Sequence, residues 1–294
     1  MILAVDIGGT SVKLALVDRE GRIGPRGAAD TAFDNYRTPM LDTVVRAAEA
    51  FVRQAGAAIE GVGISATGQI DTESGVVIGT NGMIPNYEGS NLKAAMERTF
   101  DVPAWALNDA NAAALGECFV GRARGLRHVV MATYGTGVGG GIVIDGQIYG
   151  GTRGIAGEIG LFPMGNGLYE GRASASALVR AAERASGETG LNGRIVFDRL
   201  AEGDGTLRKV VDAWLDDVAA GLIGLTHVFN PQMIVVGGGV SAREAEFVRP
   251  LRERVLAGVR PRFAEGLRIE AAALGNDAGL VGAARYFMDR ETRE

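Results

Sequence analysis

The chain has 294 residues, of which 47% are hydrophobic and 22% are charged, and its formal net charge is −5. This length is enough for two compact domains, and the composition excludes a disordered or fibrous chain. The slightly acidic balance, without a Lys/Arg stripe interleaved with aromatics, disfavours a nucleic-acid partner and favours a small molecule.

The first predicted element is a β-hairpin with glycine at its bend. A strand at 2–6 leads into the bend Gly8, Gly9 and Thr10, and a second strand follows at 12–17. The elements expected next are, in order, a helix at 41–54, a strand at 59–65, a helix at 91–100, a short strand at 104–107 and an alanine-rich helix from 110 to about 120.

The hairpin pattern recurs in the second half of the chain, which suggests a duplicated architecture. A strand at 129–133 precedes the glycine bend Gly135–Gly141, and a second strand at 142–144 ends in a turn at 145–146. Later elements are expected to be helices at 174–186 and 207–229, a strand at 233–236, a helix at 244–256, a strand at 267–272 and a last helix at 278–288. Strands that alternate with helices predict an α/β protein.

Both glycine bends are candidates for phosphate contact, because glycine lets backbone N–H groups approach an anion without a Cβ in the way. The first bend is equally typical of a structural hairpin turn, whereas Gly135–Gly141 holds more glycine than a hairpin needs. Gly135, Gly137 and Gly140 fit the spacing of a dinucleotide fingerprint. A strand follows them instead of a helix, which argues against a Rossmann oxidoreductase, and a Walker A spacing is absent as well.

Asn108 and Asp109 stand between a strand and the alanine-rich helix, so one of them is expected to cap that helix. Capping needs only one of the two. The other would face a cleft, where a carboxylate accepts a proton from a hydroxyl and an amide hydrogen-bonds neighbouring hydroxyls. Together with the glycine bends, this pair predicts a phosphoryl-transfer site.

Further polar and glycine-rich segments have both a functional and a structural interpretation. Glu158 and Glu170 follow Gly157 and Tyr169 in a region expected to be a glycine-rich loop. There they either accept hydrogen bonds from sugar hydroxyls or are solvated surface acids. Gly237–Gly239, at a strand-to-helix junction, admits a nucleoside or serves close packing.

The remaining reactive side chains are predicted to be structural. Cys118 is the only cysteine, which excludes an internal disulfide and a thiolate metal site and favours a buried thiol. His128 precedes a strand and His227 lies in an apolar helix, without metal-ligand neighbours. No apolar run approaches the length of a membrane span and no signal peptide is evident, so a cytoplasmic protein without membrane contact is expected.

Four segments in order resemble the ROK family of repressors, open reading frames and sugar kinases. They are Asp6-Ile7-Gly8-Gly9-Thr10, Asn108-Asp109-Ala110-Asn111-Ala112-Ala113-Ala114-Leu115-Gly116-Glu117, Gly135-Thr136-Gly137-Val138-Gly139-Gly140-Gly141 and Gly157-Glu158-Ile159-Gly160. The resemblance covers nearly the whole chain, and the order of the segments carries it more than any single motif.

The resemblance implies the actin-like ATPase fold, also called hexokinase-type or ribonuclease H-like, with the site between two lobes. It implies a small N-terminal α/β lobe at 1–107, joined by the final helix at 278–294, and a large C-terminal lobe at 108–277. The expected reaction is transfer of the ATP γ-phosphate, with Mg²⁺, to the primary (6-) hydroxyl of a hexose or N-acylhexosamine, with Asp109 as general base and lobe closure excluding water. By resemblance, the sugar-binding residues are Gly68, Asn108, Asp109, Glu158 and Glu170, and the ATP-binding residues are Asp6, Gly8, Gly9, Thr10, Gly135, Thr136, Gly137, Gly238 and Gly239. A homodimer is also expected.

One departure from the family pattern concerns zinc. Typical members follow the Gly-Glu-Ile-Gly segment with a histidine and a cysteine-rich zinc loop, but here that position is Leu161 and no cysteine follows before Glu170. No structural zinc is therefore expected, and the loss of the histidine's polar contact with the sugar leaves glucose, N-acetylmannosamine and β-glucosides open as substrates.

Two other classes of function remain as alternatives. A sugar-responsive ROK regulator is disfavoured, because the chain starts at the first strand without a helix-turn-helix and keeps the Asn108-Asp109 pair. A non-catalytic sugar-binding protein would bind sugar without releasing ADP.

Overall fold

A computed structural model describes residues 1–80, 82 and 84–292 of the chain. Internal contacts group these residues into two compact units. The first unit comprises 1–124, 147–156 and the chain from 276 onward, and the second comprises 125–146 and 157–275. The alanine-rich helix is grouped with the first unit, and it packs against the last helix of the chain.

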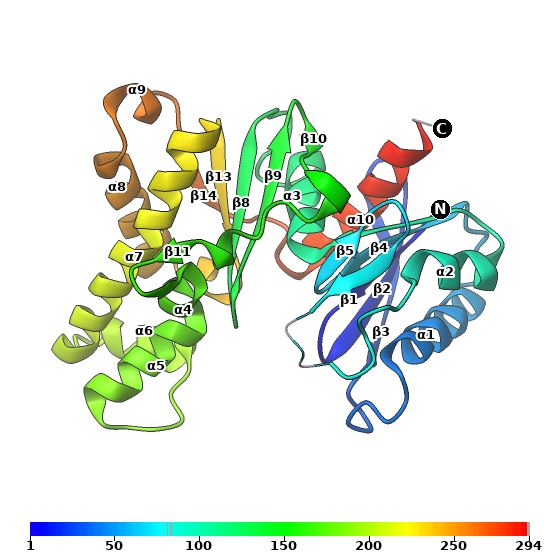
Figure 1. The fold of residues 1–294 in the computed structure, drawn as a ribbon, viewed down its shortest axis with the longest axis horizontal. Coiled ribbons are helices and arrows are strands. Elements are labelled where there is room, and N and C mark those ends of the chain that lie inside the picture. The colour runs from blue at the N-terminus through cyan, green and yellow to red at the C-terminus, as the bar shows by residue number, and fades with distance from the viewer. Residues whose placement is uncertain (81, 83, 293–294) are drawn as a thin grey trace. The chain divides into compact units, whose positions relative to one another are not determined.

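The first unit is built on a five-stranded sheet in the order β3-β2-β1-β4-β7, of which β1 to β4 are labelled in Figure 1. Its strands are β1 (Ile2–Ile7), β2 (Ser11–Val17), β3 (Ile23–Asp30), β4 (Gly61–Ala66) and β7 (Ala104–Asn108). β2 is antiparallel to both β1 and β3, whereas β1, β4 and β7 are parallel. A small hairpin of β5 (Gln69–Asp71) and β6 (Val76–Gly79) follows β4.

Alternate side chains of β1 enter two different cores, as expected when both faces of a sheet are covered. Leu3, Val5 and Ile7 pack with α1 (Met40–Ala55) and α2 (Leu92–Phe100), whose N-cap is Asn91. Ile2 and Ala4 pack on the opposite face with α3 (Asp109–Phe119) and α10 (Ala278–Glu291). The helix that begins at Asp109 therefore lies against the sheet whose strand β7 leads into it.

The α3–α10 contact is so close that no side chain fits between the helices at two glycines. A Cβ at Gly282 would lie 1.7 Å from the Ala112 carbonyl oxygen, and one at Gly116 would lie 2.5 Å from the Ala278 carbonyl oxygen. Glycine at both positions lets the two backbones meet directly and fixes where α3 lies.

The sheet associated with the second unit repeats the strand order of the first, as the recurring hairpin predicted. Its order is β10-β9-β8-β13-β14, with β8 and β9 antiparallel and β8, β13 and β14 parallel (Figure 1). The strands are β8 (Val129–Tyr134), β9 (Val138–Ile144), β10 (Gln147–Ile148), β13 (Met233–Gly237) and β14 (Arg268–Ala271), of which β10 falls in a segment grouped with the first unit.

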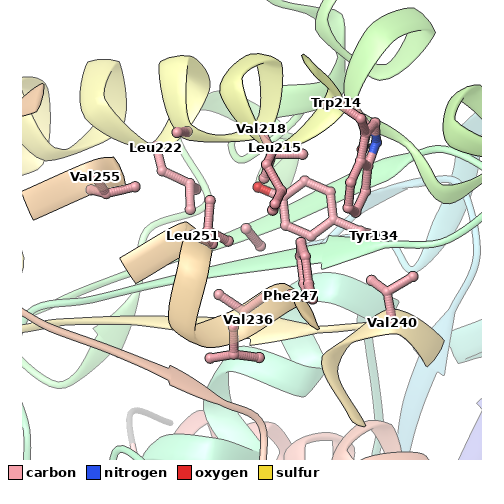
Figure 2. Packing of buried hydrophobic residues seen from close by; sticks show 14 of the residues in the cluster. Tyr134, Trp214, Leu215, Val218, Leu222, Val236, Val240, Phe247, Leu251 and Val255 are labelled. Atoms are coloured by element: carbon pink, nitrogen blue, oxygen red, sulfur yellow. Dashed lines mark hydrogen bonds between the residues drawn. The ribbon is translucent and has the colours of Figure 1, made fainter. Parts of the chain in front are cut away.

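Helices of the second unit bury one apolar core against this sheet. They are α4 (Tyr169–Ala173), α5 (Ala175–Ser186), α6 (Gly193–Ala201), α7 (Gly205–Phe229), α8 (Arg249–Gly258) and α9 (Pro261–Ala264), and a short hairpin of β11 (Pro163–Met164) and β12 (Gly167–Leu168) precedes α4. Figure 2 shows Trp214, Leu215, Val218 and Leu222 of α7 in this core with Phe247. The Phe247 ring stacks edge-on to Tyr134 at 5.9 Å and lies 5.1 Å from Trp214.

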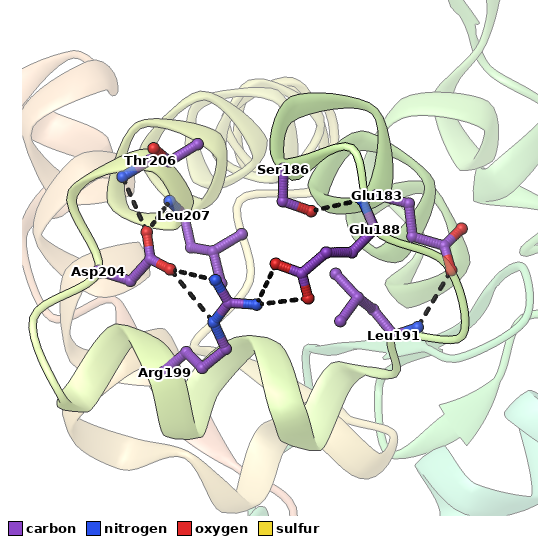
Figure 3. A network of polar contacts seen from close by, with 8 residues as sticks. All are labelled: Glu183, Ser186, Glu188, Leu191, Arg199, Asp204, Thr206 and Leu207. Atoms are coloured by element: carbon purple, nitrogen blue, oxygen red, sulfur yellow. Dashed lines mark hydrogen bonds and ion pairs between the residues drawn. The ribbon is translucent and has the colours of Figure 1, made fainter.

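A polar network holds the segment that leads from α6 into α7, at the surface of the second unit (Figure 3). Asp204 caps α7 through the N–H groups of Thr206 and Leu207, at 2.9 and 3.0 Å. Arg199 of α6 bridges Asp204, at 2.7 Å, and Glu188, at 2.8 Å. The hydrogen bond from the Leu207 N–H, ahead of the other bonds, holds the pKa of Asp204 below its usual range.

Three predicted elements are wrong in detail. Gly139–Gly141 belong to β9 and not to a bend, and Gly140 is needed there because its Cβ would lie 2.6 Å from the Gly157 carbonyl oxygen. The helix expected at 244–256 begins as a π-helical turn at Glu244–Val248, and only Arg249–Gly258 is α-helical. Glu170 lies in the first turn of α4 and not in a loop.

Candidate active site

Three parallel strands of the first unit end side by side, and each is followed by a predicted site segment. The register aligns their last residues, Ile7, Ala66 and Asn108. Because the carboxyl ends of parallel strands meet at one edge of a sheet, the bend Gly8–Thr10, Gly68 and Asp109 emerge at the same edge.

The structure divides the roles of Asn108 and Asp109. Asn108 is the N-cap of α3, and its Oδ1 accepts hydrogen bonds from Ala110 N at 2.9 Å and Asn111 N at 3.2 Å. Asp109 is the first residue of the helix, and its side chain is exposed to solvent. Its Oδ1 also accepts from Ala110 N at 2.8 Å, which orients the carboxylate.

Asn108 also holds in place the loop that follows the neighbouring strand, β4. Its Nδ2 donates to the Gly68 carbonyl at 2.9 Å, so both ends of the carboxamide make hydrogen bonds within the first unit. Gly68 has a φ of +94°, and a Cβ there would lie 2.8 Å from the Gly79 carbonyl oxygen. Only glycine fits that backbone, and one N–H of Asn108 is left for a ligand.

Asp6, at the end of β1, is held by partners that sequence reasoning missed. Ser65 Oγ donates to Asp6 Oδ1 at 2.7 Å, and Lys13 Nζ lies 3.3 Å from Oδ2. Ser65 is fully buried, and Gly279 at the start of α10 leaves room for the carboxylate, since its Cβ would lie 2.7 Å from Oδ1. No local sequence pattern marks Ser65, whose role arises from the β1–β4 register.

Tyr87 is a second residue near the site that the sequence did not indicate. It is 1% exposed, and its hydroxyl makes no hydrogen bond to the residues that the structure describes. Burial, and then the negative charge of Asp109, raise the pKa of this phenol well above its usual value. The phenol therefore stays protonated at neutral pH.

In the second unit, two further glycine segments follow paired strand ends. β8 ends next to β13, with Thr133 opposite Gly237. Gly135 N–H donates to the Gly137 carbonyl at 3.0 Å, which closes a tight and exposed bend after β8. Gly238 has a φ of +89°, and its Cβ would lie 2.2 Å from the Tyr134 carbonyl oxygen, so its segment abuts that bend.

Glu170 lies against the second bend, and Glu158 is nearby along the chain. A Cβ at Gly137 would lie 2.6 Å from Glu170 Oε2, and one at Gly160 would lie 3.3 Å from the same atom. Glu170 is held there by α4, whose Tyr169 is fully buried and donates its hydroxyl to the Val218 carbonyl at 2.9 Å. Glu158, which is half-buried, directly precedes the 3₁₀ turn Ile159–Leu161.

The predicted site residues thus form two groups, one in each unit. The first unit holds Asp6, Gly8, Gly9, Thr10, Gly68, Asn108 and Asp109, and the second holds Gly135, Thr136, Gly137, Glu158, Glu170, Gly238 and Gly239. Each group combines glycine bends with carboxylates, which is the composition that phosphate contact and hydroxyl recognition require.

Metal-ligand and thiol chemistry depend on particular side chains in the described part of the chain. None of its His, Cys, Asp and Glu side chains forms a group of three or more that could hold a metal ion. Burial raises the pKa of the Cys118 thiol to about 12. His227 Nε2 accepts a hydrogen bond from Arg260 N at 3.3 Å, which fits its predicted structural role.

Among the residues that the structure describes, none of the helices combines the length and apolar character that crossing a membrane requires.

Comparison with known proteins gives one consistent result. The ROK family model matches residues 2–290. A glucokinase of Thermotoga maritima is 31% identical over 98% of both chains, and a β-glucoside kinase of Klebsiella pneumoniae is 30% identical over 97% of this chain and 95% of its own. The crystal structure of a ROK glucokinase from Streptomyces griseus, in complex with glucose and AMPPNP, is 30% identical with a TM-score of 0.81, covering 97% of this chain and 98% of its own.

Proposed function

The chain belongs to the ROK family, has the actin-like ATPase fold and is an ATP-dependent sugar kinase, and we propose that Asp109 is its general base. In this proposal the enzyme phosphorylates the primary (6-) hydroxyl of a hexose or N-acylhexosamine. The observation that carries it is the exposed carboxylate of Asp109 at the sheet edge where the Gly8–Thr10 bend also emerges.

The proposed reaction moves one proton and one phosphoryl group. The Asp109 carboxylate takes the proton of the primary hydroxyl as its oxygen attacks the γ-phosphorus, and the bond between that phosphorus and the ADP oxygen breaks. The N-terminus of α3 is the positive end of the helix dipole, which is a favourable position for the carboxylate. The hydrogen bond from Ala110 N to Asp109 Oδ1 holds the carboxylate in one orientation.

Other residues are assigned to binding. Gly68, Asn108, Glu158 and Glu170 would bind sugar hydroxyls, and the bends Gly8–Thr10 and Gly135–Gly137 would bind the ATP phosphates. Gly238 and Gly239, which are both exposed, would border the adenosine. What supports the ATP-binding assignments is open space: among the residues that the structure describes, apart from the two chain neighbours, none has an atom within 4 Å of a Cβ built at Gly9, Gly135 or Gly239.

The donor set fits a Mg²⁺ ion that arrives with the nucleotide. Mg²⁺ is commonly held by one or two carboxylates plus phosphates and water, and Asp6 is the carboxylate at the first bend. When bound, the ion would neutralise charge on the phosphate oxygens. No structural zinc is proposed, since Leu161 and the single cysteine of the chain leave no thiolate set.

The sugar itself is proposed by class. The relatives include kinases of glucose and of β-glucosides, and glucose is the first candidate. N-acetylmannosamine and β-glucosides are the alternatives, because Leu161, which is 47% exposed, offers no polar group to the sugar. We also propose a cytoplasmic homodimer.

The test is ADP release with Mg-ATP and glucose, mannose, N-acetylglucosamine, N-acetylmannosamine or a β-glucoside, followed by NMR of the product. Phosphorylation at the 6-position of at least one sugar is expected. Turnover with none of them, or a product phosphorylated at C1, would contradict the proposed specificity. Sugar binding without ADP release would favour a non-catalytic sugar sensor.

A further inference from the structure

A strap of residues 31–38 follows β3 and contains an unfavourable backbone conformation. Asn35 and Tyr36 are consecutive non-glycine residues with a φ of +58° each. Such left-handed residues persist only where surrounding contacts hold them, and they are frequent at functional sites. Here Asp34 Oδ2 accepts from Thr38 N at 2.9 Å and from Thr38 Oγ1 at 2.7 Å, which fixes the ends of the turn.

The strap is hydrogen-bonded to the first glycine bend. The Gly9 carbonyl accepts a hydrogen bond from Thr31 Oγ1 at 3.1 Å and another from the Tyr36 hydroxyl. Thr31 N–H donates to the next carbonyl, that of Thr10, at 3.0 Å. A carbonyl oxygen has two lone pairs, so both acceptor positions of Gly9 are occupied and its peptide plane cannot rotate without breaking a bond.

This fixed carbonyl determines where the next N–H points. In a trans peptide, the N–H of Thr10 points away from the Gly9 C=O. Because the strap holds this carbonyl, the Thr10 N–H points to the side of the bend that faces away from the strap. Within the described part of the chain, the N–H groups of Gly9 and Thr10 have no hydrogen-bond acceptor. They are donors of the kind that bind oxyanions in glycine bends.

We propose that Thr31 and Tyr36 are positioning residues that orient the Gly9-Thr10 peptide for a phosphate of the nucleotide. The inference rests on the proposed phosphate-binding role of Gly8–Thr10. Thr31 is fully buried, so it acts through the bend and touches no substrate. Loss of either hydroxyl frees one lone pair of the Gly9 carbonyl and lets the peptide plane rotate, which weakens ATP binding and leaves sugar binding unchanged.

The test compares Thr31→Val, Tyr36→Phe and the double variant, with KM measured separately for ATP and for the sugar that the wild type uses best. Each single variant should raise the KM for ATP about fivefold, the equivalent of one hydrogen bond, and the double variant more. The KM for the sugar should change less than about twofold, because neither variant removes a hydrogen bond to the sugar. Thr31→Ser keeps the hydroxyl and should therefore have the same KM for ATP as the wild type.

Two matched controls separate positioning from general destabilisation. Thr226→Val removes another fully buried threonine hydroxyl, which donates to the Leu222 carbonyl at 2.8 Å in the second unit. Tyr149→Phe removes a hydroxyl from a tyrosine that is 48% exposed. Both should leave the KM for ATP unchanged, even where Thr226→Val lowers the melting temperature.

One further variant distinguishes failure of this inference from failure of the proposed function. Gly9→Val fills the open space of the bend and should raise the KM for ATP strongly. If it does so while Thr31→Val and Tyr36→Phe do not, the positioning role is overturned and the bend's role stands. An equal rise in both KM values in the strap variants would also overturn it. If Gly9→Val has no effect, the phosphate role of the bend and the inference both fail.

Discussion

The α3–α10 contact predicts that Gly282→Ala destabilises the first unit, although alanine is ordinarily the better helix residue. A Cβ at position 282 would lie 1.7 Å from the Ala112 carbonyl oxygen and 2.4 Å from its carbon. Both atoms belong to the backbone of α3 and cannot turn aside as a side chain would. The two helices must therefore move apart.

The magnitude follows from two opposing terms. Overpacking of a filled core costs about 1–3 kcal/mol, and a clash with backbone belongs at the upper end of that range. Replacing glycine by alanine within a helix returns roughly 0.5–1 kcal/mol. The free energy of unfolding of the first unit should thus fall by about 2 kcal/mol.

The chain offers a probe for each unit, because its two tryptophans, Trp105 and Trp214, lie in different units. Urea unfolding of the first unit is followed by Trp105 fluorescence in a Trp214→Phe background. Gly224→Ala is the matched control, followed by Trp214 in a Trp105→Phe background. Position 224 is exposed and lies within α7, and a Cβ built there would meet no atom within 4 Å in the described part of the chain beyond its own helical turn, so this variant should be stabilised.

The test is whether the free energy of unfolding changes in opposite directions in Gly282→Ala and Gly224→Ala. The reasoning predicts opposite signs for the same chemical substitution. If Gly282→Ala were as stable as its parent, the close approach of α10 to α3 would not exist in solution.

Three further predictions concern buried and capping groups. Tyr169→Phe should lower the stability of the second unit by about 1–3 kcal/mol in urea unfolding, because the Val218 carbonyl and the Tyr134 hydroxyl lose a buried partner; an unchanged midpoint would contradict the network. Asp204→Ala should destabilise at pH 7 and much less at pH 3, since a lowered pKa means that the carboxylate's stabilisation is present above the unfolded-state pKa and is lost as pH falls through the folded-state value; an equal loss at both pH values would refute this. Cys118 should react slowly with Ellman's reagent at pH 8 in the native enzyme and rapidly in urea, because burial raises its pKa to about 12; fast native labelling would show an accessible thiolate.

Periodicity predicted most elements of both sheets, but it missed the edge strand β3. Its sequence contains Gly24, Pro25 and Gly27, which are poor in a strand interior. β3 forms because it pairs only with β2, and an edge strand tolerates proline where a central strand does not. This pairing depends on tertiary structure, which a local pattern does not contain.

The sequence predicted the strand-to-helix junction at Asn108 and Asp109, and it also predicted that one of the two residues would cap the helix. The supporting contacts were not predicted. Ser65 reaches Asp6 across 59 residues, and Tyr36 reaches Gly9 across 27, through strand register and a strained turn. Residues that act through such contacts have no local signature, whereas glycine clusters and strand ends do.

The most direct test of the Asp109 proposal is the rate of ADP release by Asp109→Asn beside Asp101→Asn, with sugar affinity measured by calorimetry in each. Asp101 is an exposed C-cap residue with a φ of +52°, a conformation that asparagine accepts readily, so its variant should match the wild type. Removal of a positioned base should lower kcat by a factor on the order of one hundred or more while sugar affinity changes little. Full-speed sugar phosphorylation by Asp109→Asn would show that this carboxylate is not the base.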